Sequence, residues 1–193
     1  MELPYKIILA SNSPRRRELL AGLGMDFTVK VIGGIDESWP HNLKGEDIPL
    51  YISREKAAPY KAAIASDELV ITADTIVYVD GEVLGKPTDK ADARRMLRLI
   101  SGRWHEVITG VTLMTAERER SFAVTTKVKF CNLTDEEIDS YVDSGLPMDK
   151  AGAYGIQEWI GYVGVEAIEG SYFNVVGLPV QRLYRELISF CRQ

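Results

Sequence analysis

The stretch that decides the fold lies near the start of the chain and reads Leu9-Ala10-Ser11-Asn12-Ser13-Pro14-Arg15-Arg16-Arg17. It follows an apolar run from Tyr5 to Ala10, which predicts a buried strand, and it precedes residues 18–23, which predict a helix. Ser13 is a suitable N-cap, and Pro14 suits the first helical position, where its missing N–H costs nothing. The chain is therefore expected to turn sharply from a strand into a helix.

The same turn predicts a phosphate site. The first N–H groups of a helix carry positive partial charge, and three arginines stand beside them against the helix dipole. Hydroxyls from Ser11 and Ser13 and guanidinium groups from Arg15 and Arg16 are typical ligands of phosphate. The alternative is an ordinary solvated basic face beside a capped helix.

Composition limits the class of protein. The 193 residues are 46% hydrophobic, which fits one globular domain, compact or two-lobed, with a substantial core. The net charge of 23 − 28 = −5 argues against a nucleic-acid partner and favours a small anionic ligand. Cys131 and Cys191 lack metal-ligand spacing, which predicts free thiols in a reducing compartment. No apolar run approaches the length of a membrane span, so we expect a soluble cytoplasmic protein with no membrane partner.

Strands alternating with helices predict an α/β or α+β fold around a mixed sheet. Further strands are expected at residues 27–32, 69–79, 82–84, 107–115, 121–131, 163–168 and 172–176. Helices are expected at residues 47–66 with a kink or break at Pro59, from Thr88 or Asp89 to about Ile100, from Thr134, and from Pro179 to Cys191.

Asp74 stands inside an otherwise β-branched run. Aspartate is depleted in strands, and a buried carboxylate without partners is costly. Asp74 therefore either serves a metal ion or a catalytic water, or accepts backbone N–H groups at a bulge or turn.

Three other segments carry weaker signals. Lys86 lies between Gly85 and Pro87 on a turn, and Lys56 lies on the expected helix; either lysine is, taken alone, more often simply solvated. Gln157 ends the small-residue stretch 149–157, where the backbone can approach a ligand. Its amide offers an acceptor beside a donor, which matches the N3–H and O4 of uracil or thymine. Without other signs of a nucleotide, a surface glutamine would be the simpler interpretation.

Taken together and in order, these motifs resemble those of the Maf family of nucleoside triphosphate pyrophosphatases. The matching segments are residues 9–16, 36–37, 54–57, 73–75, 85–87, 149–157 and 176–179. The resemblance implies a fold like that of the inosine-triphosphate pyrophosphatases. That fold is an elongated mixed sheet with flanking helices and a cleft between two lobes, here a single two-lobed domain over residues 1–193.

The resemblance also implies a substrate. Arg15, Thr75 and Gln157 match the branch that acts on dTTP and UTP, whereas a sister branch acting on 7-methyl-GTP has Glu in place of Gln157. Two features depart from the pattern of relatives, Asn12 and the segment Glu158-Trp159-Ile160.

The implied mechanism cleaves a nucleoside triphosphate between its α and β phosphates. Cationic groups hold the triphosphate, namely those of Arg15, Arg16, Lys56 and Lys86. Glu37 and Asp74 hold Mg²⁺ or Mn²⁺, and Asp74 is also the base that activates water. The family likeness further implies a homodimer. The alternative function is a nucleotide-binding regulator of cell division and septum formation with incidental hydrolysis.

Overall fold

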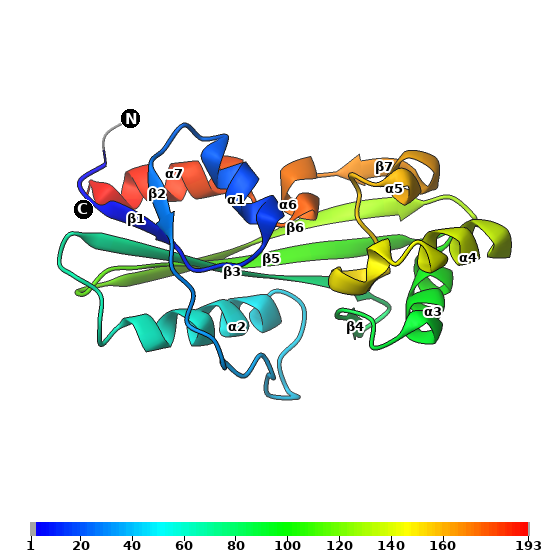
Figure 1. Cartoon of the computed structure of the whole chain (residues 1–193), viewed down its shortest axis with the longest axis horizontal. Helices are drawn as coiled ribbons and strands as arrows, with labels where there is room; N and C mark the ends of the chain where they lie inside the picture. Colours follow the sequence, from blue (N-terminus) through cyan, green and yellow to red (C-terminus); the bar gives the residue numbers. More distant parts are fainter. Residues whose placement is uncertain (1–2, 193) are drawn as a thin grey trace. The chain divides into compact units, whose positions relative to one another are not determined.

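The computed structural model describes residues 3–192. These residues form a seven-stranded sheet in the order β2-β1-β3-β5-β6-β7, with β4 paired to β3 (Figure 1). β1 runs parallel to both β2 and β3, whereas β3/β4 and β6/β7 are antiparallel. The strands are β1 (Lys6–Leu9), β2 (Phe27–Val29), β3 (Glu68–Val79), β4 (Glu82–Leu84), β5 (Trp104–Met114), β6 (Glu119–Phe130) and β7 (Val165–Glu169). The predicted mixed sheet is therefore confirmed.

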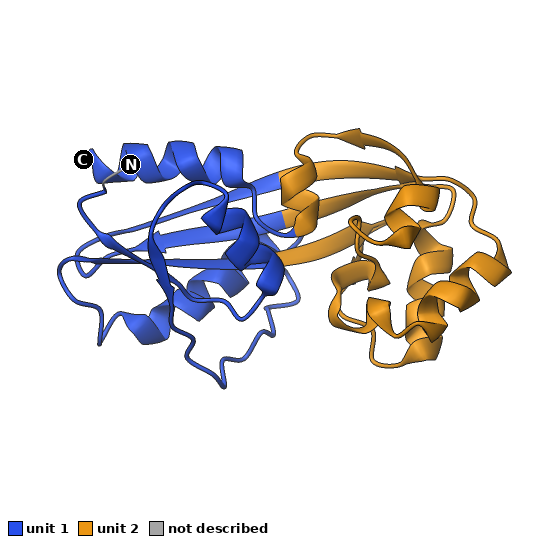
Figure 2. Cartoon of the chain, turned by 45° about the horizontal axis from the view of Figure 1, so that its top comes forward, with its two compact units in different colours: residues 1–74, 109–124, 177–193 blue, residues 75–108, 125–176 orange. Residues whose placement is uncertain are grey.

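The chain divides into two compact units (Figure 2). Unit 1 comprises residues 1–74, 109–124 and 177–193, and unit 2 comprises residues 75–108 and 125–176. Strands β3, β5 and β6 each contribute residues to both units.

Unit 1 has helices on both faces of its strands (Figure 1). Ile7 and Leu9 of β1 point into one core with α1 (Pro14–Ala21) and α7 (Val180–Cys191). Ile8 points the other way, into a smaller core with α2 (Asp47–Ala57) and the 3₁₀ turn η1 (Ala58–Tyr60). A strand buried on both faces is expected to be continuously apolar, as the buried residues Ile7, Ile8 and Leu9 of β1 are.

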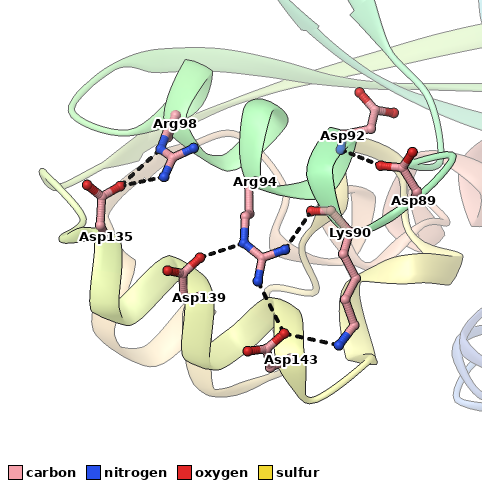
Figure 3. Close-up of polar contacts among 8 residues, drawn as sticks. All are labelled: Asp89, Lys90, Asp92, Arg94, Arg98, Asp135, Asp139 and Asp143. Atoms are coloured by element: carbon pink, nitrogen blue, oxygen red, sulfur yellow. Dashed lines mark hydrogen bonds and ion pairs between the residues drawn. The ribbon is translucent and has the colours of Figure 1, made fainter.

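In unit 2, α3 (Lys90–Ile100) and α4 (Asp135–Asp143) lie side by side (Figure 3). The chain then makes two 3₁₀ turns and two short helices, η2 (Leu146–Asp149), η3 (Ala151–Ala153), α5 (Trp159–Gly164) and α6 (Tyr172–Val176). None of the helices in the described part of the chain has the length and apolarity needed to cross a membrane.

The structure confirms several predicted helix starts. Ser13 caps α1 with Pro14 at its first position, and Asp89 caps α3 by accepting the N–H of Asp92 at 2.8 Å. Thr134 and Glu137 form a capping box at α4. The expected interruption at Pro59 is present, because α2 ends at Ala57 and gives way to η1. The expectation that helix continues beyond it to Ser66 was wrong, since residues 61–66 form turns and irregular backbone.

One prediction near the C-terminal end of unit 2 was wrong, because residues 172–176 form α6 rather than a strand. The strand expected at 163–168 is present as β7, which begins at Val165, after α5. Ser171 accepts the N–H of Asn174 at the start of α6, and the buried Asn174 amide donates to the carbonyl of Val107 at 3.0 Å. These tertiary contacts outweigh the strand preference of a short β-branched and aromatic segment.

Candidate active site

The loop between β1 and α1 forms the start of a helix, and its two serine hydroxyls accept hydrogen bonds from backbone N–H groups of the loop. Ser13 Oγ accepts the N–H of Arg16 at 3.4 Å, and the buried Ser11 Oγ accepts the N–H of Ser13 at 3.3 Å. Arg15 is half-buried on the first turn of α1. The loop therefore presents hydroxyls, helix N–H groups and guanidinium groups together, which is the donor set expected for phosphate.

Arg16 fastens this loop to two other segments of unit 1. Its Nε donates to the carbonyl of Gly177 at 2.9 Å, and its Nη1 donates to the carbonyl of Ala73 at 2.9 Å. Burial lowers the pKa of Arg16, and the negative charge of Asp74 acts in the opposite direction. The guanidinium thus stands beside Asp74 and holds the end of the β1 loop against β3.

The central feature of unit 1 is one ammonium group between two carboxylates. Lys56 Nζ on α2 lies 2.7 Å from Asp74 Oδ1 and 3.1 Å from Glu37 Oε1. The side chains of Lys56 and Asp74 are only 14% and 11% exposed, whereas Glu37 is 59% exposed. Asp74 itself lies within the continuous strand β3. The predicted residues Glu37, Lys56 and Asp74 are therefore brought together.

The predicted metal ligands form a pair rather than a larger cluster. Glu37 and Asp74 both reach the same ammonium group, so their carboxylates face one small volume. Within residues 3–192, no group of three or more His, Cys, Asp and Glu side chains could hold a metal ion. Two carboxylates suit a hard cation such as Mg²⁺ when substrate phosphates and water supply the other oxygens.

Helix α2 carries Lys56 and sits unusually close to the sheet. A Cβ at Gly110 on β5 would lie 2.3 Å from the backbone carbonyl of Pro49, so only glycine permits this approach. Ser53 Oγ lies 2.9 Å from Thr112 Oγ1, and Thr72 Oγ1 donates to the Ser53 carbonyl at 2.6 Å. Close backbone contact and buried hydroxyls therefore fix the helix that positions Lys56.

The remaining predicted residues belong to unit 2. Thr75 follows Asp74 directly on β3 and is half-buried. Lys86 is exposed on a loop whose preceding residue, Gly85, accepts the N–H of Gly152 at 3.0 Å. Gln157 is exposed in the turn before α5. The predicted segments 85–87 and 149–157 are thus hydrogen-bonded to each other.

Unit 2 also has a hollow of about 440 Å³. It is lined by Tyr78, Val79, Asp80, Trp104, His105, Glu106, Lys127 and Glu169. None of the predicted site residues is among them, so we do not assign the nucleotide site to this hollow.

Comparison with known proteins decides the family. The family model described as "Maf-like protein" matches residues 6–190. The chain belongs to the Maf family. It is 62% identical over 183 residues to a protein of Phocaeicola vulgatus and 61% identical over 183 residues to one of Bacteroides fragilis, with 95% of each chain covered. A protein of Porphyromonas gingivalis is 51% identical over 188 residues, covering 96% of this chain and 94% of its own. All three are named dTTP/UTP pyrophosphatase.

A solved structure supports the fold. The Staphylococcus aureus Ham1 protein matches with a TM-score of 0.52 at 17% sequence identity, covering 94% of this chain and 99% of its own. Similarity at that identity concerns the architecture alone.

Sequence patterns did not reveal several residues that shape the Maf site. The carbonyl of Gly177 accepts a hydrogen bond from Arg16, and Gly110 allows the backbone of α2 to lie close to β5. The hydroxyl of Ser53 links α2 to the sheet. Each is a single small residue whose role depends on a partner far along the chain. The only local sign was that residues 176–179 belong to the family motif set.

Proposed function

We propose that this Maf protein hydrolyses dTTP and UTP to the nucleoside monophosphate and pyrophosphate. The observation that carries the proposal is the ammonium of Lys56 between Asp74 and Glu37, in the same unit as the Ser11–Arg16 loop. The names of relatives that are more than half identical over nearly the whole chain support the substrate.

In this mechanism the triphosphate is held by Ser11, Ser13, Arg15, Arg16, Lys56 and Lys86. Enzymes that act on phosphate anhydrides work chiefly by positioning the substrate and stabilising its charge. Asp74 accepts a proton from the attacking water. The water oxygen bonds to the α phosphorus, the bond from that phosphorus to the oxygen bridging the α and β phosphates breaks, and pyrophosphate leaves with the bridging oxygen.

The ion pair with Lys56 explains how a carboxylate can be placed at the nearly buried position of Asp74. A positive group 2.7 Å away compensates the charge of a carboxylate that is nearly buried. Because Glu37 is more exposed and shares the same ammonium, it is free to turn toward a ligand without leaving Asp74 unpaired.

We further propose that Glu37 and Asp74 hold Mg²⁺ or Mn²⁺ together with substrate phosphates. Such an ion would neutralise phosphate charge and ease deprotonation of water. Arg15, Thr75 and Gln157 are the proposed specificity residues, with Gln157 pairing to the N3–H and O4 of the pyrimidine.

The test is release of pyrophosphate from a panel of nucleoside triphosphates, with and without Mg²⁺ or Mn²⁺. We expect hydrolysis led by dTTP and UTP and dependent on the metal. Release led by 7-methyl-GTP would contradict the proposed specificity, and no release from any nucleotide would contradict the proposed function.

Asp74→Asn should lower kcat at least about 10²-fold, because removing a general base typically costs that much. Circular dichroism and the melting temperature would establish that the variant is folded. Activity close to wild type in a folded Asp74→Asn protein would exclude Asp74 as the base.

A further inference from the structure

Lys150 is a buried lysine outside the proposed chemistry. The residue is only 8% exposed, although lysine is almost never fully buried unless it is paired. Its Nζ lies 2.6 Å from the Leu146 carbonyl oxygen, 2.6 Å from Asp149 Oδ1 and 2.7 Å from Glu158 Oε1. An ammonium group has three N–H donors, so these three acceptors satisfy it completely.

Glu158 extends this contact to a second helix. While Oε1 faces Lys150, Oε2 accepts a hydrogen bond from the hydroxyl of Tyr141 on α4. The Tyr141 oxygen in turn accepts the backbone N–H of Gly155 at 3.1 Å. Burial and the bond to Glu158 raise the pKa of Tyr141, so its hydroxyl keeps the proton that it donates. Lys150, Glu158 and Tyr141 thus form one continuous chain of polar contacts, here called the loop anchor.

The loop anchor encloses one short segment of unit 2. It grips residues 150, 155 and 158, which bracket the loop that ends at Gln157. The packing around Gly155 is too tight for a side chain, because a Cβ at this position would lie 2.8 Å from both Lys150 Cε and Glu158 Cδ. At the other end, a Cβ at Gly152 would lie 2.7 Å from Val77 Cγ2.

Gln157 itself depends on this support. Its side chain is exposed, and none of the hydrogen bonds or ion pairs found in the described part of the chain involves it. The backbone of the loop therefore sets where the Cα of Gln157 lies and how far its amide can reach.

We propose that Lys150, Glu158 and Tyr141 are positioning residues that fix the loop bearing Gln157 and thereby set discrimination between pyrimidine bases. This inference rests on the proposed function. Cytosine has an acceptor at N3 and a donor amine at C4, the reverse of uracil. The paired geometry with N3–H and O4 therefore favours UTP over CTP, provided the loop holds the Cα of Gln157 where this pairing is reached. An error of about 1 Å in placement can cost up to about 10²-fold in rate.

The experiment compares kcat and KM for UTP and CTP in Tyr141→Phe and in wild type. Phenylalanine keeps the buried ring but loses both contacts of the hydroxyl. We expect the ratio of kcat/KM for UTP over CTP to fall roughly tenfold, mainly through a higher KM for UTP. A purely structural role would lower kcat/KM for both nucleotides alike and leave the ratio unchanged.

The matched control is Tyr162→Phe, since Tyr162 lies on α5 in the same unit and is 81% exposed. It should leave both ratio and rate at wild-type values. Gln157→Ala should lower the ratio as well, and adding Tyr141→Phe to it should lower the ratio no further, because both changes act on one amide.

Glu158→Gln provides a second variant in case Tyr141→Phe does not fold. It keeps the shape of the side chain and removes the charge that faces Lys150, and the ratio should fall in the same direction. An unchanged ratio in a folded, active variant would overturn the role of the loop anchor and leave the proposed hydrolysis intact. A wild-type protein inactive on UTP would instead refute the proposed function, and this inference with it.

Discussion

Helix α2 of unit 1 and helix α3 of unit 2 both carry basic side chains that pair with carboxylates on other segments, but the two sets of pairs differ in burial. On α2, Lys56 is nearly buried and serves two carboxylates at once. On α3, three basic residues at intervals of four meet three acidic residues at intervals of four on α4 (Figure 3). The pairs are Lys90–Asp143 at 3.0 Å, Arg94–Asp139 at 2.5 Å and Arg98–Asp135 at 2.8 Å.

The distances are similar in the two places, so burial makes the difference. Exposed ion pairs contribute little to stability because water and salt screen them and long side chains lose freedom. A buried charge cluster costs desolvation energy and is weak support for a fold. The three ion pairs between α3 and α4, here called the α3–α4 ladder, therefore align two antiparallel helices. The cluster of Lys56, Asp74 and Glu37 is better explained by a role in substrate binding or catalysis.

The largest effect should come from breaking the buried cluster. Lys56→Gln removes the ammonium group that pairs with both Glu37 and Asp74, together with a charge proposed to meet the triphosphate. We expect kcat/KM for dTTP to fall at least about 10²-fold, as when other preorganised charge-stabilising groups are removed.

Lys90→Gln is the matched control for Lys56→Gln. It makes the same substitution at a lysine paired with one aspartate on the α3–α4 ladder. Activity should stay at the wild-type level. Equal losses of activity in the two variants would show that the comparison between buried and exposed pairs is mistaken.

Features of this molecule could be predicted from the sequence where the interacting residues are close together in the chain, and could not where they are far apart. Ser13 and Thr134 cap helices through contacts three residues away, so the local pattern was sufficient. Asp74 stood out because a carboxylate in an apolar strand requires a partner. The partner itself was not predicted as such, because Lys56 lies 18 residues away on a different element.

Other features had no local signature at all. Residues 172–176 form a helix because Asn174 is buried against Val107, and that contact spans 67 positions. The approach of Pro49 to Gly110 likewise depends on how α2 lies on β5. The loop anchor joins α4 to the turn before α5, and no local pattern marks Glu158 as the partner of both Lys150 and Tyr141.

His105 is a buried polar group in unit 2, the unit that also carries the exposed ion pairs. It therefore tests whether burial, rather than the unit in which a residue lies, determines the size of the effect. His105 is 2% exposed, and its Nε2 lies 2.7 Å from the hydroxyl of Tyr154. Burial lowers the pKa of His105 from 6.5 to about 4. The unfolded chain therefore binds a proton at a higher pH than the folded protein, and stability falls as pH decreases from about 6.5 to about 4.

The expected loss from this single group is about 3 kcal/mol across that window. His105→Gln can keep a hydrogen bond to Tyr154 and should remove this part of the pH dependence. Urea unfolding at pH 7 and pH 4.5 would measure it, with the exposed His41→Gln as the control. Identical pH dependence in wild type and His105→Gln would mean that His105 does not titrate differently in the folded state.

The smallest effect should come from the ladder, where Arg94 is the central contact. Its Nε lies 2.5 Å from Asp139 and its Nη2 lies 3.2 Å from Asp143, and these neighbours raise its pKa. Arg94 is half-buried, but its partners Asp139 and Asp143 are 49% and 59% exposed, so water and salt reach these pairs. Arg94→Gln should therefore lower the melting temperature by only about 3 °C or less. The apolar face of α3, which buries Ala93, Met96, Leu97 and Ile100, would still hold the helix. High salt should shrink the difference between variant and wild type, because it screens exposed charges. A larger loss of stability that salt does not change would mean that the ladder behaves as a buried network.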